Sequence, residues 1–215
     1  DVMEYLIATW ETVYMSFASS FFAIVLGLPL GILLVMSQKD GIKENLKLYH
    51  VLDVIINVLR SIPILILIVL LFPLSRFLVG RSTGTAAAIV PMFISAAPFV
   101  ARIMEQSLNE VDKGIIEAAR SMGVTDYEMV RHVMVPEALP SIINGVTIVM
   151  INLIGYSAIA VVIGGGGLGD LALQFGYYRK EKMALYLSVI IIVLLVQIVQ
   201  LSGNTLRRAL DKRAK

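Results

Sequence analysis

Long apolar blocks separated by charged segments constrain the fold of this chain more than any single motif does. They cover about residues 12–36, 51–74, 84–104, 141–163 and 184–202. Each block has roughly the twenty residues that a helix needs to cross about 30 Å of hydrocarbon at about 1.5 Å per residue. Short strands with period-two alternation are not evident, which argues against a barrel. The pattern predicts an all-α membrane protein with five transmembrane helices.

The composition agrees with a location in the bilayer. The 215 residues are 58% hydrophobic and 16% charged, whereas soluble domains have about 45–50% apolar and about 25% charged residues. The absence of cysteine excludes disulfides, thiolate metal sites and cysteine nucleophiles, and two distant histidines, His50 and His132, give little basis for a metal site. No repeat or linker-like tract divides the chain, so we expect one domain over residues 1–215.

The distribution of lysine and arginine predicts the orientation. With the N-terminus outside, the inner segments hold Lys39, Lys43, Lys47, Arg102, Lys113, Arg120, Arg131, Arg207, Arg208, Lys212, Arg213 and Lys215. The outer segments then hold only Arg76, Arg81, Arg179, Lys180 and Lys182. Because cytoplasmic loops carry the excess of basic residues, we expect the C-terminus and the segment 107–139 to lie in the cytoplasm.

The segment 107–139, between the third and fourth blocks, begins with the pattern of a short helix. Residues 111–122 combine helix-forming residues with an apolar stripe, and Gly123 follows where a left-handed C-terminal cap is favoured. We therefore expect the first short helix to end at Gly123.

A second short helix is predicted directly after this hinge. Thr125 and Glu128 have the spacing of a capping box, so a helix over about residues 126–134 should begin there. Pro136 and Pro140 should stop this helix and turn the chain back into the membrane, because proline disfavours helix just before it. The expected product is a helix, a hinge and a helix beneath the bilayer.

One face of the fourth block is polar. At about 100° per residue, Asn144, Thr147, Asn152, Gly155 and Tyr156 share one half of a helix surface. Polar groups at this depth should face the bundle or a wet cavity, so this face is a candidate substrate pathway. Hydrogen bonding between helices is an equally good interpretation of the same face.

A glycine-rich run follows the fourth block and contains Gly164, Gly165, Gly166, Gly167 and Gly169. It lacks the Gly-Lys-Ser/Thr ending of a phosphate-binding loop and follows an apolar block, so we do not expect nucleotide to bind there. The remaining interpretations are a loop that needs positive φ angles and close packing near an outer gate.

The predicted spans hold few charges, which favours passage of a zwitterion with an apolar side chain over an ion pathway. Asp53 and Arg60 are the exception. They lie seven residues apart on one face near the inner end of the second block, and we expect them to form an interfacial or packing pair.

The segment 107–139 resembles a known family. Glu117-Ala118-Ala119, three residues, Gly123, nine residues and then Val133-Met134-Val135-Pro136 resemble the EAA loop of permease subunits from bacterial binding-protein-dependent ABC importers. Val133 and Val135 depart mildly from the usual pattern. Longer stretches, at residues 60–63, 87–91, 97–102, 136–140, 155–158 and 164–169, are similar to the permeases of methionine importers.

The resemblance implies a type I ABC importer permease fold and a set of partners. These would be a second copy of the chain, two ATP-binding cassette subunits that bind ATP and magnesium, and an external substrate-binding lipoprotein. The permease itself would have no catalytic site, no cofactor and no nucleic-acid partner. It would lie in the bacterial cytoplasmic membrane and take up D- or L-methionine.

The resemblance also assigns residues to the contact with the ATPase. A coupling helix would cover about residues 125–131. The coupling residues would be Glu117, Ala118, Ala119, Arg120, Gly123, Thr125, Asp126, Tyr127, Glu128, Arg131 and Pro136.

Alternative functions stay open at this point. The substrate could be another amino acid or a small zwitterion. An ion-coupled secondary carrier should show inverted repeats, interrupted spans or buried acidic residues, and none is evident in the sequence. A structural scaffold is disfavoured by the polar face of the fourth block.

Overall fold

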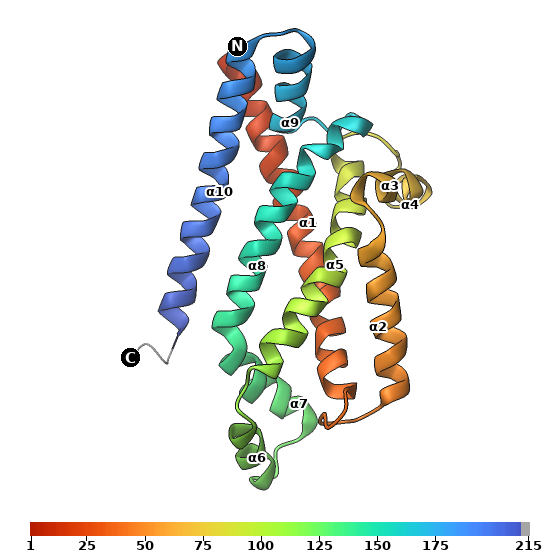
Figure 1. Ribbon diagram of the computed structural model, residues 1–215, viewed down its shortest axis with the longest axis vertical. Coiled ribbons are helices and arrows are strands. Elements are labelled where there is room, and N and C mark those ends of the chain that lie inside the picture. Colours follow the sequence, from red (N-terminus) through yellow and green to blue (C-terminus); the bar gives the residue numbers. More distant parts are fainter. Residues whose placement is uncertain (212–215) are drawn as a thin grey trace.

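The computed structural model describes residues 1–211, and every regular element in that range is helical (Figure 1). Lys212, Arg213 and Lys215, which entered the orientation argument, lie outside the described residues. The elements are α1 (Val2–Ser37), α2 (Leu46–Ser61), α3 (Ile64–Leu70), α4 (Phe72–Val79), α5 (Thr85–Asn109), α6 (Lys113–Ser121), α7 (Asp126–Glu128), η1 (Met129–Met134), α8 (Val135–Ser157), η2 (Ile159–Ile163), α9 (Gly167–Leu171), η3 (Ala172–Tyr178) and α10 (Lys182–Leu210).

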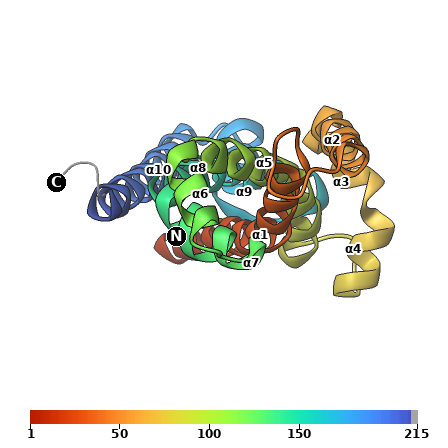
Figure 2. The ribbon, with the colours of Figure 1, turned by 90° about the horizontal axis from the view of Figure 1, so that it is seen from below.

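The long helices α1, α5, α8 and α10 run along the molecule (Figure 1). Viewed from below, α2, α3 and α4 lie on one flank and α10 lies on the opposite flank (Figure 2). The N-terminus lies at one end of the bundle, and α10 ends toward the other (Figure 1).

The centre of the bundle is the contact between α1 and α5. Gly27 and Gly31 of α1 lie directly against α5, since an added Cβ would come within 2.6 Å of the Ala97 carbonyl oxygen and 2.7 Å of the Ala101 carbonyl oxygen, respectively. In a bilayer, small residues at such positions let two backbones approach closely. The contact leaves α5 the most enclosed of the long apolar helices, with 67% of its apolar stretch buried against 17% for α10.

Four helices in residues 1–211 are long and apolar enough to cross a membrane, and they rise to five if the bent pair of α2 and α3 is one span. The second apolar block is therefore not the straight helix that the pattern predicts, because α2 and α3 meet at 102°. The cause is Pro63, which has no N–H to donate and disfavours helix at Ile62. The sequence interpretation that no span is interrupted is wrong at this break.

The structure differs from the sequence expectation at one further span boundary. Helix α1 begins at Val2, well before the predicted start at about residue 12. Helix α5 runs from Thr85 to Asn109 as one helix with Pro91 and Pro98 inside it.

The predicted stop before Pro136 is also wrong, because α7, η1 and α8 form one continuous helical path from Asp126 to Ser157. The N–H of Val135 bonds to the Val130 carbonyl, five residues back, in a π-helical turn. Pro136 then falls in the first turn of α8, where a missing N–H is tolerated. Pro140 lies inside α8 without breaking it.

Candidate functional site

The segment between α5 and α8 protrudes from one end of the bundle, where α6 and α7 form a small projection (Figure 1). Its inner face is apolar. Ala119, Met129 and Met134 are buried in one cluster with Leu108 and Val111, which ties the projection to the bundle. The projection is therefore anchored to the helices that cross the membrane and is free on its outer side.

Gly123 provides the hinge that the sequence predicts. Its φ angle is +81°, in the left-handed region that glycine tolerates and most other residues avoid. Its N–H donates to the Arg120 carbonyl at 3.0 Å, and nothing lies within 4 Å of an added Cβ. The requirement for glycine is thus one of backbone conformation and not of space.

The predicted capping box of α7 is confirmed. The Glu128 N–H donates to the Thr125 hydroxyl oxygen at 3.3 Å, and the Thr125 N–H donates to the Glu128 carboxylate at 2.8 Å. The Thr125 N–H, helped by its hydroxyl, lowers the pKa of the Glu128 carboxyl below its ordinary value. The hinge at Gly123 is thus followed directly by the start of α7, where the capping box provides hydrogen-bond acceptors for the N–H groups of Thr125 and Glu128.

The outer side of the projection carries the remaining candidate coupling residues. The Arg131 guanidinium donates to the Tyr127 hydroxyl at 2.6 Å and so holds that ring against the helix. Ala119 is the exception among the candidates, because it is buried in the cluster described above. The exposed candidates are Glu117, Ala118, Arg120, Gly123, Thr125, Asp126, Tyr127, Glu128, Arg131 and Pro136.

Two apolar side chains are unusually exposed on this projection. Met122 is 80% exposed and Tyr127 is 64% exposed, in the same segment as the exposed charged residues Glu117, Arg120 and Asp126. Exposed aromatic and methionine side chains with charged neighbours have the composition of a protein-binding surface.

The candidate pathway residues of α8 do not share one environment. Asn144 lines a cavity of about 270 Å³ next to the projection. Thr147 is buried against α10, and its hydroxyl donates to the Ile143 carbonyl at 2.8 Å. Asn152 and Tyr156 line a different cavity, of about 470 Å³, where α2, α5 and α8 meet at the break before α3. Gly155 is exposed, with nothing within 4 Å of an added Cβ.

The glycine-rich run packs against its own chain. Gly164, Gly166 and Gly167 have φ angles between +67° and +88°, as a loop with positive φ requires. The Gly167 N–H donates to the Glu11 carboxylate at 2.7 Å, and the Leu168 N–H donates to the Thr12 hydroxyl at 2.9 Å. A Cβ on Gly165 would come within 2.6 Å of the Ala160 side chain, and one on Gly169 within 2.6 Å of the Ala158 side chain.

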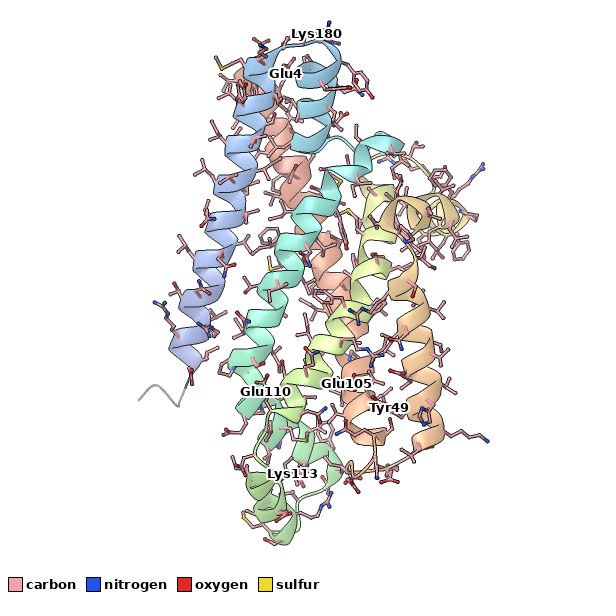
Figure 3. The ribbon with its side chains drawn as sticks, in the orientation of Figure 1. Glu4, Tyr49, Glu105, Glu110, Lys113 and Lys180 are labelled. Carbon is pink, nitrogen blue, oxygen red and sulfur yellow. The ribbon has the colours of Figure 1, made fainter. Side chains whose placement is uncertain are left out.

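The predicted pair between Asp53 and Arg60 does not form. The Asp53 carboxylate instead accepts from Arg102 of α5, and Arg102 also bonds to Asn57 at 2.8 Å and to Glu105 at 2.8 Å. The Tyr49 hydroxyl completes this network by donating to Glu105 at 2.9 Å, as the neighbouring side chains in Figure 3 show.

Sequence reasoning missed this network because its partners lie in two helices and far apart along the chain. Glu105 is also largely buried, with 13% of its side chain exposed. The burial of this acidic residue was not evident from the sequence. The available signal was the run of polar residues at four-residue spacing, Tyr49, Asp53 and Asn57, on one face of α2.

A helical bundle with an anchored, hinged projection at one end is the architecture of a membrane transport subunit that works with a second protein. The family comparison makes this specific. Residues 23–215 match the family described as "Binding-protein-dependent transport system inner membrane component", and the chain belongs to this family.

Individual relatives agree with this assignment. The chain is 45% identical to the probable D-methionine transport system permease protein MetI of Vibrio cholerae, over 97% of this chain and 92% of that protein. It is 47% identical to the protein of the same description from Haemophilus influenzae, over 96% and 97%. A solved structure described as "Inward facing conformations of the MetNI methionine ABC transporter" superposes with a TM-score of 0.96 at 42% identity, covering 98% of both chains.

Proposed function

We propose that this chain is the permease subunit of an ATP-driven importer that takes up methionine, in its D or L form, across the bacterial cytoplasmic membrane. The class of transporter is supported by membership of the family and by the fold. The substrate is supported by relatives that are named for D-methionine transport and match nearly the whole chain. Residues 1–215 would form one transmembrane domain.

The single observation that carries the coupling role is the hinged projection, with Gly123 in a left-handed conformation directly before the Thr125 cap. A separate ATPase subunit, which binds ATP and magnesium, would dock on its exposed face. A stiff, anchored projection transmits force because the cluster around Ala119 and Met129 links it to α5 and α8. The side chains that a partner can contact are those of Glu117, Arg120, Tyr127 and Arg131.

The assembly that follows from this role has a second copy of the chain, two ATPase subunits and an external substrate-binding lipoprotein. The projection then lies in the cytoplasm with the C-terminus, and the N-terminus lies outside. The distribution of basic residues supports this orientation. Substrate would pass along α8 beside Asn152 and Tyr156, and the glycine run at residues 164–169 would pack near the outer gate.

Reconstitution tests the whole proposal. The permease, its ATPase and its binding protein are placed in proteoliposomes, and uptake of labelled L-methionine is measured with and without ATP. Competition by D-methionine and by other apolar amino acids defines the substrate. Uptake that does not depend on ATP would refute the ABC importer role, whereas ATP-driven uptake of a different amino acid would refute only the substrate.

A further inference from the structure

Arg60 occupies an unusual position, in the last turn of α2 directly before the break at Pro63. Its side chain lines the cavity of about 470 Å³ that contains Asn152 and Tyr156. Because a guanidinium is always charged, the wall of this cavity carries a permanent positive charge.

The charge of Arg60 is not neutralised by any carboxylate of residues 1–211. Its recorded contact is with the Phe99 ring, whose centroid lies 5.9 Å from the guanidinium carbon. Arg102 of the neighbouring helix α5 does have carboxylate partners, because it binds both Asp53 and Glu105. Asp53, seven residues before Arg60 and the acid nearest to it along α2, is thus already engaged.

Arg60 is an exposed residue of this chain, so its guanidinium is accessible to an anion that enters the cavity. Arginine is also the side chain best shaped to hold a carboxylate, because its planar guanidinium donates two parallel hydrogen bonds. The structure thus contains one half of an ion pair, facing a cavity.

The rest of the cavity suits the other parts of an amino acid. Asn152 and Tyr156 make no side-chain hydrogen bond within the described chain, so their oxygen atoms can accept from an ammonium group. The remaining wall is largely apolar, with Ile64, Phe99 and Leu153 among its side chains. The volume and the mixture of an apolar wall with a few polar groups are typical of small-molecule sites.

We propose that this cavity is a substrate site within the membrane domain, in which the Arg60 guanidinium binds the α-carboxylate of a zwitterionic amino acid. The oxygens of Asn152 and Tyr156 accept from its ammonium group, and the apolar wall receives its side chain. This inference rests on the proposed function, and it adds a binding step in the permease itself.

The test compares a ligand that has the carboxylate with one that lacks it. Binding of labelled L-methionine to the permease–ATPase complex in phosphatidylcholine nanodiscs is measured with unlabelled L-methionine or L-methioninamide as competitor. Wild type should bind methionine about tenfold to one-hundredfold more tightly than the amide, the range expected for a charged hydrogen bond. Arg60→Gln should weaken methionine binding by that factor and remove the discrimination, and Arg60→Lys should restore part of it.

Arg76→Gln is the matched control, because Arg76 is an exposed arginine of α4 that does not line the cavity. It should bind both ligands as wild type does. If Arg60→Gln binds and discriminates as wild type does, the proposal is overturned. This result is expected if Arg60 binds a lipid phosphate and not the methionine carboxylate. If Arg60→Gln does not assemble with the ATPase, Asn152→Ala decides, and unchanged methionine binding overturns the site.

ATP-driven uptake, measured in parallel in proteoliposomes with the binding protein, separates this inference from the function on which it rests. Uptake by wild type together with unchanged discrimination in Arg60→Gln removes the site and leaves the importer role standing. A wild-type complex without ATP-driven uptake removes both.

Discussion

Gly203 in α10 lies so close to Thr147 in α8 that a Cβ atom on Gly203 would come within 2.6 Å of the Thr147 Cγ2 atom and would overlap its hydroxyl. Helix α10 is the least buried of the long apolar helices, and this is one of the places where it packs against α8. The small residue Gly203 lets the backbones of α10 and α8 approach closely at this point.

Gly203→Ala should destabilise the protein by about 1–3 kcal/mol, because the added methyl group forces α10 away from α8. Thermal unfolding of the detergent-solubilised complex measures the loss. Adding Thr147→Ala removes the clashing Cγ2 and hydroxyl and should recover part of it. Gly155→Ala is the control, since nothing lies within 4 Å of its added Cβ, and an equal loss there would contradict the explanation.

Local signals in the sequence predict the projection well. Gly123 and the pair of Thr125 and Glu128 behave as expected because each depends on a backbone conformation or a hydrogen bond within a few residues of chain. The predicted helix over 111–122 is observed as α6, shorter by a residue or two at each end.

Signals that depend on distant contacts are not in the sequence pattern. Averaged hydropathy joins the residues on both sides of Pro63 into one block and so conceals the 102° bend. Asp53 meets Arg102 across 49 positions of sequence, a pairing that helix periodicity cannot reveal. Pro136 misleads for a different reason, because the π-turn before it accommodates the missing N–H.

The network around Arg102 should be important for holding α2, since Ile56 is the one fully buried side chain of that helix. Arg102→Met leaves Glu105 and Asp53 without their counter-charge. We expect a loss of about 2–3 kcal/mol in the free energy of unfolding, less than for a fully buried pair, because Asp53 is 30% exposed. Thermal unfolding of the complex measures this.

The double change of Arg102→Met with Glu105→Gln is the informative comparison for this network. The double variant removes the positive charge of Arg102 and the negative charge of Glu105 together, so Glu105 is not left as an unpaired charge. It should therefore destabilise the protein less than Arg102→Met alone. A double variant as unstable as the sum of the two single variants would show that the ion pair contributes nothing.

The cap of α7 should be measurable by amide exchange. Thr125→Ala removes the hydroxyl that accepts from the Glu128 N–H, a change that costs about 1 kcal/mol in other helices, so exchange over residues 126–129 should accelerate by about fivefold. Thr125→Ser keeps a hydroxyl and should exchange nearly as wild type does. Equal exchange in wild type and Thr125→Ala would exclude a stabilising cap.

The same cap should depend on pH through Glu128. Its pKa is lower in the folded protein than the ordinary 4.5, so its contribution is complete above 4.5 and is lost as the pH falls through the folded-state value. Protection of the amides of residues 126–129 should therefore decline on acidification in wild type. Glu128→Gln should show no such decline, and a decline of the same size there would assign the effect to another group.

Gly123→Val should separate insertion from coupling. Because the open space around Gly123 admits a larger side chain, the change acts only through φ, and a β-branched residue resists the observed +81° by more than the roughly 1–2 kcal/mol typical of the left-handed region. The variant should reach the membrane but lose ATPase co-purification and ATP-driven uptake. Gly123→Asn, which tolerates positive φ, should retain most of both. Wild-type co-purification and uptake in Gly123→Val would rule out the hinge as part of the coupling.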